Sequence, residues 1–300
     1  YDSAIVSKKE SPHLSILTVP ADEPRKAARH GRIEQVFEDV FIVRGKMPST
    51  SSRPLFERLF LYYSRTMTVV RSYDDQGEAE LTLFNTLRLN DRALKDLAEL
   101  GAVKHVVRLG SFHGVDDAFY IDRFNAQYWI VDSMMSADGL RVLPNVLSNE
   151  GHAGLPIAGT KLFNFDGLAY PEAIYLLPAT ENRPGLAITT DCIQNHTTVF
   201  DVDNSPLVSL AIWRIGLAGE ARLGPIWLRE QTPRVPTDDA GEGDRPASRR
   251  EISTFLKPQF ERLLETCDFD ALIAGHGWPI RMAAKAAIKR SIEDQLEMRQ

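Results

Sequence analysis

The chain has 300 residues, 43% of them hydrophobic and 25% charged, which is typical of a globular protein that buries a sizeable core. Its formal net charge of −6 argues against a general nucleic-acid binder, because such a protein needs a basic surface to neutralise phosphates. The two cysteines, Cys192 and Cys267, are too few for a disulfide framework or a cysteine-rich zinc site and indicate a reducing, cytoplasmic compartment. No apolar run reaches the length of a membrane span, so no membrane partner is expected.

Residues 1–35 are polar and mixed in charge, which predicts a poorly structured N-terminal arm before a single domain over 36–300. The domain begins with β-branched and apolar runs that are separated by turn residues, and then changes to a helical period that ends at Gly101. The next run has no polar alternation, so we expect a strand that is buried on both faces. The pattern predicts strands over 37–47, 65–75, 78–85 and 102–110, with one helix around 90–100.

The second half continues with short strands and with helices near its end. The stretch 208–219 fits a helix or a strand, 232–250 is expected to be a mobile loop, and Pro258 is expected to kink or split its helix. We expect strands over 159–167, 172–179, 185–193 and 271–280, and helices over 251–270 and 281–300. This order predicts two mixed β-sheets stacked on each other with helices outside, a four-layered α/β/β/α sandwich. A doubly wound parallel sheet is the alternative, but it needs a more regular alternation of strands and helices.

Candidate chemical groups lie where buried strands end. His113 and His276 each follow such a strand, and Asp191 ends another. Strand ends are where ligand sites form in α/β folds, and nitrogen and oxygen donors of this kind bind zinc, iron(II) or manganese. The competing interpretation is structural: Asp191 would cap a turn, and Asp116 and Asp117 would occupy the first turn of a helix.

These motifs and their order resemble the metallo-β-lactamase fold superfamily over about residues 37–285. A strand, a helix and a strand lead into "SFHGVDD", and "LAITTDCIQN" and "ALIAGHGWPI" follow in the order of that family. The resemblance implies the α/β/β/α sandwich and a metal site at strand-end loops. Its ligands would be His113, Asp117, Asp191 and His276, with Asp166 as a further candidate.

The sequence also departs from the family pattern. The first motif has one histidine instead of three, Asn85 stands where an aspartate is common, and the mid-chain histidine has no counterpart, which leaves Asp166 as the comparable donor. Fewer imidazoles and more carboxylates favour one site over a binuclear site, and a harder ion, iron or manganese, over zinc.

The resemblance implies a metal-dependent hydrolase of a small ester, lactone, thioester or amide-like substrate that acts through a metal-activated water. Asp116 or Asp117, where not bound to metal, would be the general base or proton shuttle. The alternative is a catalytically inactive protein of the same fold that has lost its metal and binds a ligand or a partner. The sequence does not decide between them. The expected partner is a small-molecule substrate, and a homo-oligomer is left open.

Overall fold

The computed structural model describes residues 26–46, 63–134, 142–149, 154–197, 206–235 and 244–297. The first sheet has seven strands that neighbour one another in chain order. Its strands are β1 (Glu34–Phe37), β2 (Val40–Lys46), β3 (Ser64–Tyr73), β4 (Ala79–Phe84), β5 (Ala102–Arg108), β6 (Gln127–Ile130) and β7 (Asn145–Val146). The strands β1 to β4 are antiparallel, whereas β4 to β7 run parallel. Parallel neighbours need crossover connections, which α2 (Asp91–Leu100) and α3 (Asp117–Phe124) supply between β4 and β6.

The second sheet has four strands in the order β13-β10-β9-β8. They are β8 (Lys161–Asn164), β9 (Ala173–Leu177), β10 (Leu186–Ile188) and β13 (Ala271–Ile273). The strands β10 and β13 are parallel and the other pairs are antiparallel. A separate antiparallel pair is formed by β11 (Ile193–His196) and β12 (Gly219–Leu223). The helices of this half are α4 (Pro206–Arg214), α5 (Pro225–Gln231), α6 (Arg249–Thr266) and α7 (Ala284–Leu296).

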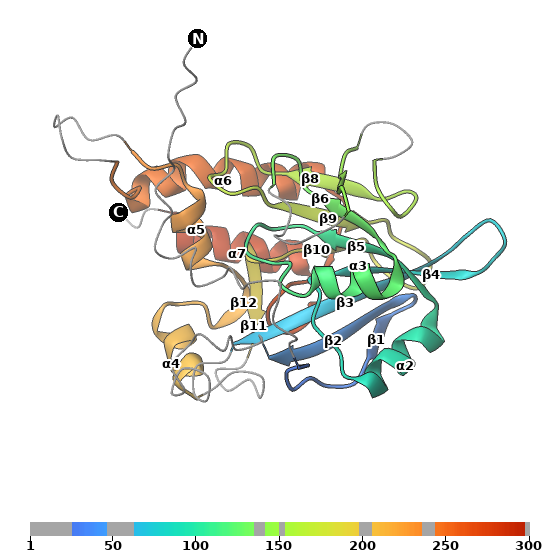
Figure 1. Ribbon diagram of the computed structural model, residues 1–300. Helices are drawn as coiled ribbons and strands as arrows, with labels where there is room; N and C mark the ends of the chain where they lie inside the picture. The colour runs from blue at the N-terminus through green and yellow to red at the C-terminus, as the bar shows by residue number, and fades with distance from the viewer. Residues whose placement is uncertain are drawn as a thin grey trace, which may run out of the picture.

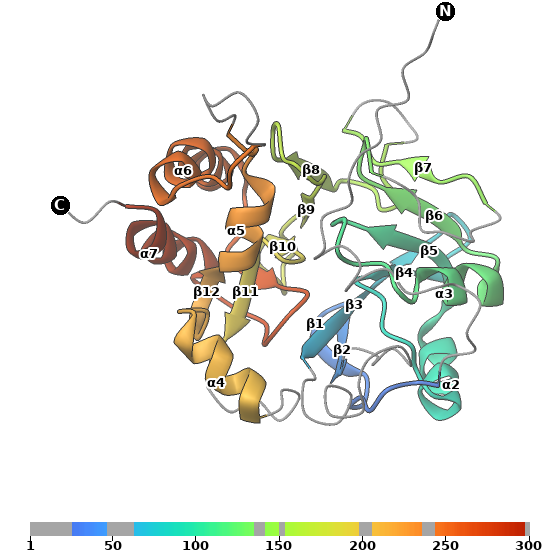
Figure 2. The ribbon, with the colours of Figure 1, turned by 60° about the vertical axis from the view of Figure 1, so that its left-hand side comes forward.

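The elements are arranged in four layers (Figure 2). Helices α2 and α3 cover the first sheet, the second sheet faces its other side, and α5, α6 and α7 cover the second sheet from outside. Side chains of β9 alternate between two cores: Tyr175 and Leu177 face the first sheet, whereas Ile174 and Leu176 face the outer helices. The predicted α/β/β/α sandwich of two mixed sheets is confirmed.

The first residues of helices α2 and α6 are fixed by N-capping side chains. The side chain of Asn90 accepts a hydrogen bond from the backbone N–H of Ala93 at the start of α2. Ser248 and Glu251 form a reciprocal capping box at the start of α6. Of the kink or split expected at Pro258, the split does not occur, because α6 runs as one helix from Arg249 to Thr266 (Figure 1). The proline removes one N–H from the helix, and the buried face on both sides of it keeps the element whole.

The structure refines two other expectations, and two further ones concern residues that it does not fully describe. The strand β5 is buried at Val106 and Val107, but Lys104 near its start is exposed and pairs with Glu80 at 3.9 Å. The ambiguous stretch 208–219 is mostly helix α4. Most of the expected arm, and residues 236–243 of the expected loop, lie outside the described residues. No helix in the described part of the chain is long and apolar enough to cross a membrane.

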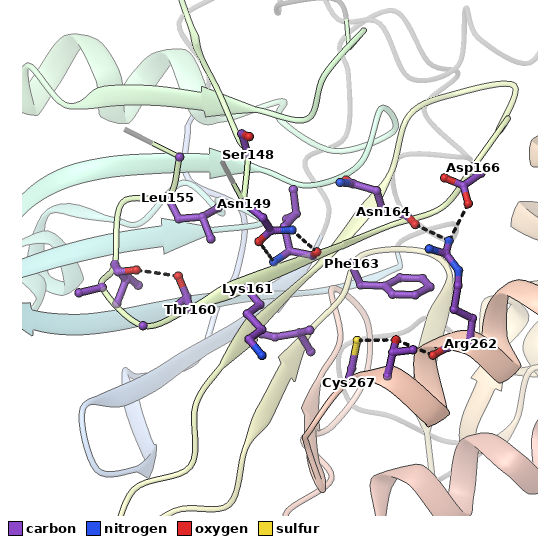
Figure 3. A pocket seen from close by; sticks show the side chains of 17 residues that line it. Ser148, Asn149, Leu155, Thr160, Lys161, Phe163, Asn164, Asp166, Arg262 and Cys267 are labelled. Atoms are coloured by element: carbon purple, nitrogen blue, oxygen red, sulfur yellow. Dashed lines mark hydrogen bonds and ion pairs between the residues drawn. The ribbon is translucent and has the colours of Figure 1, made fainter. Parts of the chain in front are cut away.

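The outer edge of the second sheet is capped by a side chain. Asn149 lies beside β8, where its Nδ2 donates to the carbonyl oxygen of Leu162 at 2.7 Å and its Oδ1 accepts from the Leu162 backbone N–H at 2.8 Å (Figure 3). The two bonds reproduce the pattern that a neighbouring strand would offer at this position.

Candidate metal site

Three side chains from three strand ends meet at one edge of the sandwich. His113 follows β5, Asp191 follows β10 and His276 follows β13, and their ligand atoms all lie within 4.8 Å of one another. We call this group the three-donor cluster. The Nε2 atom of His113 lies 3.2 Å from Oδ2 of Asp191 and 3.2 Å from Nε2 of His276, and His276 Nε2 lies 3.1 Å from Asp191 Oδ1.

The orientation of His276 is fixed by β3. Its Nδ1 atom hydrogen-bonds to the carbonyl oxygen of Ser64, and because a carbonyl only accepts, Nδ1 must carry the proton. In the neutral ring, Nε2 is then a bare lone pair that points at the other two donors. A backbone carbonyl on the far ring nitrogen is the arrangement that orients histidine ligands in metal sites.

The contacts of His113 within the three-donor cluster share few protons. Burial lowers the pKa of His113 to about 4, so its ring is neutral at neutral pH and offers at most one N–H to two acceptors. Burial alone would raise the pKa of Asp191, but the positive charges that His113 and His276 carry when protonated, and the hydrogen bonds that they then donate, hold this pKa well below its usual value. The Nε2 atom of His113 lies 3.2 Å from both Asp191 and His276, and a cation bound by all three side chains would satisfy these contacts together. A tetrahedral ion with bonds of about 2.0–2.1 Å has donors about 3.3 Å apart, and the observed separations of 3.1–3.2 Å fit it.

Glycines make room for the three-donor cluster. A Cβ atom on Gly275 would lie 2.6 Å from Cε1 of His113, so any larger residue would displace this imidazole. Gly277 has a φ of +90°, and its Cβ would lie 2.0 Å from the carbonyl oxygen of Asn195. The glycines that flank His276 thus allow the loop after β13 to pack against the first motif and against β11.

The position of Asp191 depends on Glu172, which sequence reasoning missed. The backbone N–H groups of Asp191 and Cys192 both donate to Oε1 of Glu172, at 3.1 and 2.9 Å, and the indole N–H of Trp227 donates to Oε2 at 2.7 Å. Burial, followed by the charge of Asp191, raises the pKa of Glu172 to about 7. The signal in the sequence is an acid directly before the wholly apolar strand β9, where a charge needs a dedicated partner.

Asp116 and Asp117, the predicted catalytic acids, lie at the start of α3 and are both 1% exposed. Asp116 accepts a hydrogen bond from the Arg88 backbone N–H at 3.1 Å and pairs with the Arg88 side chain at 3.5 Å. Asp117 accepts hydrogen bonds from Thr86 at 2.6 Å and from Tyr128 at 3.1 Å. Neither belongs to the three-donor cluster, and their catalytic or metal-binding roles stay predictions.

Asp166, the further candidate ligand, lies on another part of the molecule. It lines a pocket of about 930 Å³ between β8 and α6, where its exposed carboxylate pairs with Arg262 at 2.8 Å (Figure 3). The structure therefore does not bring it to the three-donor cluster. Glu172 is the acid from this stretch of sequence that reaches the site.

A tyrosine and two polar residues of β11 adjoin the three-donor cluster and were not predicted. The ring of Tyr63 packs edge-on against His276 with a centroid distance of 4.6 Å. Its hydroxyl donates to Oε1 of Gln194 and lies 2.9 Å from Nε2 of His196. Burial and then the charge of Asp191 raise the pKa of Tyr63 well above its ordinary value, so this phenol keeps its proton.

The comparisons with known proteins concern the fold. No protein-family model and no curated protein matches the sequence. The chain is similar to the metallo-β-lactamase FIM-1 from Pseudomonas aeruginosa in its mono-zinc form, with 11% identity over 92% of this chain and 97% of that chain and a TM-score of 0.49. It is similar to a β-lactamase domain protein from Burkholderia ambifaria, with 13% identity, coverage of 90% and 74%, and a TM-score of 0.48.

A third similar structure is the metal-soaked flavodiiron core of Flv1 from Synechocystis, with 12% identity over 90% of this chain and 62% of that chain and a TM-score of 0.49. Solved structures of the superfamily that the sequence resembles are thus among those similar to this chain. The architecture that the resemblance predicted, a sandwich of two mixed sheets with helices outside, is the one that the structure has.

Proposed function

We propose that the chain is a metal-dependent hydrolase of a small ester, lactone, thioester or amide-like substrate, with the three-donor cluster as the ligands of one divalent ion. The observation that carries the proposal is the convergence of two imidazoles and one carboxylate at 3.1–3.2 Å, where the single N–H that the neutral His113 ring can offer does not satisfy both of its contacts. A divalent ion bound there supplies Lewis acidity and lowers the pKa of bound water, which makes water a nucleophile near neutral pH.

The donor set also bears on the choice of metal. Two imidazoles and one carboxylate suit zinc, manganese and iron(II), and a 2-His-1-carboxylate set with open positions is typical of non-haem iron(II). We therefore expect iron first, with zinc and manganese as substitutes in a protein that is loaded in vitro. Three protein donors leave coordination positions open, as catalytic sites require.

The chain's own residues would bind and orient the reacting groups. The Asp191 side chain is 16% exposed, whereas those of His113 and His276 are 2% and 4% exposed, so solvent and substrate would approach from the aspartate side. The hydroxyl of Tyr63, held by Gln194 and His196, keeps its proton and could give it to a leaving group or hydrogen-bond a developing oxyanion.

Elemental analysis of protein purified without chelators tests the proposal. We expect close to one equivalent of iron, zinc or manganese, and hydrolysis in a panel of p-nitrophenyl esters, thioesters and lactones. His113→Ala and His276→Ala should lose both the metal and the activity, whereas the matched control His105→Ala, outside the three-donor cluster, should keep them. Less than about a tenth of an equivalent in folded wild type would contradict the proposal and favour the inactive, ligand-binding alternative.

A further inference from the structure

A fully buried arginine without a direct partner lies beside the three-donor cluster. Arg65 is the second residue of β3, its side chain is 0% exposed, and Nε, Nη1 and Nη2 have no hydrogen-bond partner among the residues that the structure describes. A guanidinium stays charged in proteins, and burying its charge unpaired is costly. The charge therefore needs compensation from its wider surroundings.

The backbone on both sides of Arg65 is fastened to the loop that carries His276. The carbonyl oxygen of Ser64 binds the imidazole of His276, and the backbone N–H of Thr66 donates to the carbonyl oxygen of Gly275 at 2.8 Å. β4 pairs with β3 only from Thr68 onward, so at Ser64 and Thr66 the edge of β3 is bonded to the loop after β13 instead. Arg65 is consequently held at a fixed place relative to the three-donor cluster.

The charges that act on Arg65 belong both to the three-donor cluster and to the acids of α3. The carboxylates of Asp116, Asp191 and Asp117 attract its guanidinium, whereas the charge of Arg108 repels it. The positive charge of Arg65 acts on the imidazole of His113. None of these acids accepts a hydrogen bond from Arg65 in the described structure, so the guanidinium acts as a fixed charge among them.

We propose that the Arg65 guanidinium takes the place of a second cation beside the three-donor cluster, so that the chain binds one divalent ion next to a fixed positive charge. The inference rests on the proposed function, since it requires that the cluster holds an ion. Two ions would need about three ligands each, and the nearby acids Asp116 and Asp117 are already engaged by other residues. A permanent positive charge at this place also repels a further cation.

The test is a calorimetric titration of the metal-free protein with zinc, read as stoichiometry and affinity. We expect wild type to saturate at one equivalent. Arg65→Gln, which removes the charge, should bind the first ion at least about tenfold more tightly or bind a second equivalent. Arg65→Lys, which keeps the charge, should resemble wild type. Arg183→Gln alters another buried arginine, one that binds the carbonyl oxygens of Pro178 and Pro184, and should change nothing.

Two equivalents in wild type, or one equivalent with unchanged affinity in Arg65→Gln, would overturn the inference while leaving the proposed function intact. No zinc binding by folded wild type would instead contradict the proposed function. If Arg65→Gln does not fold, the double variant Arg65→Gln/Asp116→Asn removes one charge of each sign, and it should bind one zinc with an affinity near that of wild type. Two equivalents in that variant would also overturn the inference, and the wild-type stoichiometry decides in either case.

Discussion

At the scale of single residues, the proton on Nδ1 of His276 determines what the other ring nitrogen can do. Because Nδ1 donates its hydrogen bond to the carbonyl oxygen of Ser64, the lone pair of Nε2 in the neutral ring faces Asp191 and His113. Tyr63, whose ring packs against His276, adds a hydroxyl that keeps its proton beside the three-donor cluster. The site thus separates the three side chains of the cluster from a neighbouring hydroxyl that keeps its proton.

Replacing Tyr63 by phenylalanine should lower kcat by on the order of tenfold or more, with metal content and KM close to those of wild type. The phenol is removed while its ring still packs against His276. Steady-state kinetics with the best substrate of the ester panel, together with elemental analysis, measures the effect. Tyr175→Phe makes the same change at a hydroxyl that accepts from Thr160, and should be neutral. Loss of metal in Tyr63→Phe would show a structural role instead.

His196 should make the fold sensitive to acid. Burial lowers its pKa to about 3, so the folded state keeps the ring neutral while the unfolded state binds a proton below its ordinary pKa. The contribution of the neutral ring to stability is complete above about pH 6.5 and is lost as the pH falls toward the pKa of His196 in the folded state. Between pH 7 and pH 5, this loss should be roughly 1–2 kcal/mol of unfolding free energy. Urea unfolding at the two pH values should show a smaller loss for His196→Gln than for wild type. Burial raises the pKa of Glu172 to about 7, so this group titrates in the opposite direction over the same pH range. Its effect is the same in wild type and in His196→Gln, and it cancels when the two losses of unfolding free energy are subtracted.

At the scale of elements, the loop after β13 links the two halves of the fold. It binds β3 through Thr66 and lies against β11 at Asn195, and the contact with Asn195 depends on the lack of a side chain at Gly277. The loop therefore positions His276 and joins the sheets at the same time.

Gly275→Ala should displace His113 and lower zinc affinity, because the new Cβ would lie 2.6 Å from the imidazole. Gly77 is a useful control because its φ of +81° carries the usual strain while nothing lies within 4 Å of its Cβ. Gly77→Ala should cost about 1 kcal/mol of unfolding free energy and leave zinc affinity unchanged. Thermal melts and zinc titrations compare the two variants, and equal zinc affinities would contradict this account.

Much of this element-level picture could be predicted from the sequence. Apolar runs that stop at polar residues locate strand ends, and this pattern identified His113, Asp191 and His276. It could not identify Arg65 or Glu172, because a charge at the start of an apolar strand is also what a solvent-facing strand end offers. These two charged side chains are buried only because the second sheet and its helices pack over them.

At the scale of the whole molecule, the sandwich brings together ends of strands from both sheets. His113 follows a strand of the first sheet, whereas Asp191 and His276 follow strands of the second. An ion held by all three would therefore connect the sheets directly, and any opening of the sandwich would have to release it.

Zinc should accordingly stabilise the global fold. At a free concentration of about a hundred times Kd, we expect roughly 2–3 kcal/mol of added unfolding free energy, seen as a higher Tm that a chelator reverses. Asp191→Asn keeps the shape of the side chain but removes the charge that links the histidines. An equal zinc-induced rise of Tm in this variant would show that the ion binds elsewhere.

The side chain of Asn149 has a consequence for how copies of the molecule meet. A sheet edge with free N–H and C=O groups is a template on which strands of other chains assemble. Because Asn149 already occupies both backbone groups of Leu162 on β8, an approaching strand would find no pairing there. The side-chain amide of Asn149 thus protects this edge of the second sheet against pairing with other chains. This protection against aggregation does not depend on the chemistry of the three-donor cluster.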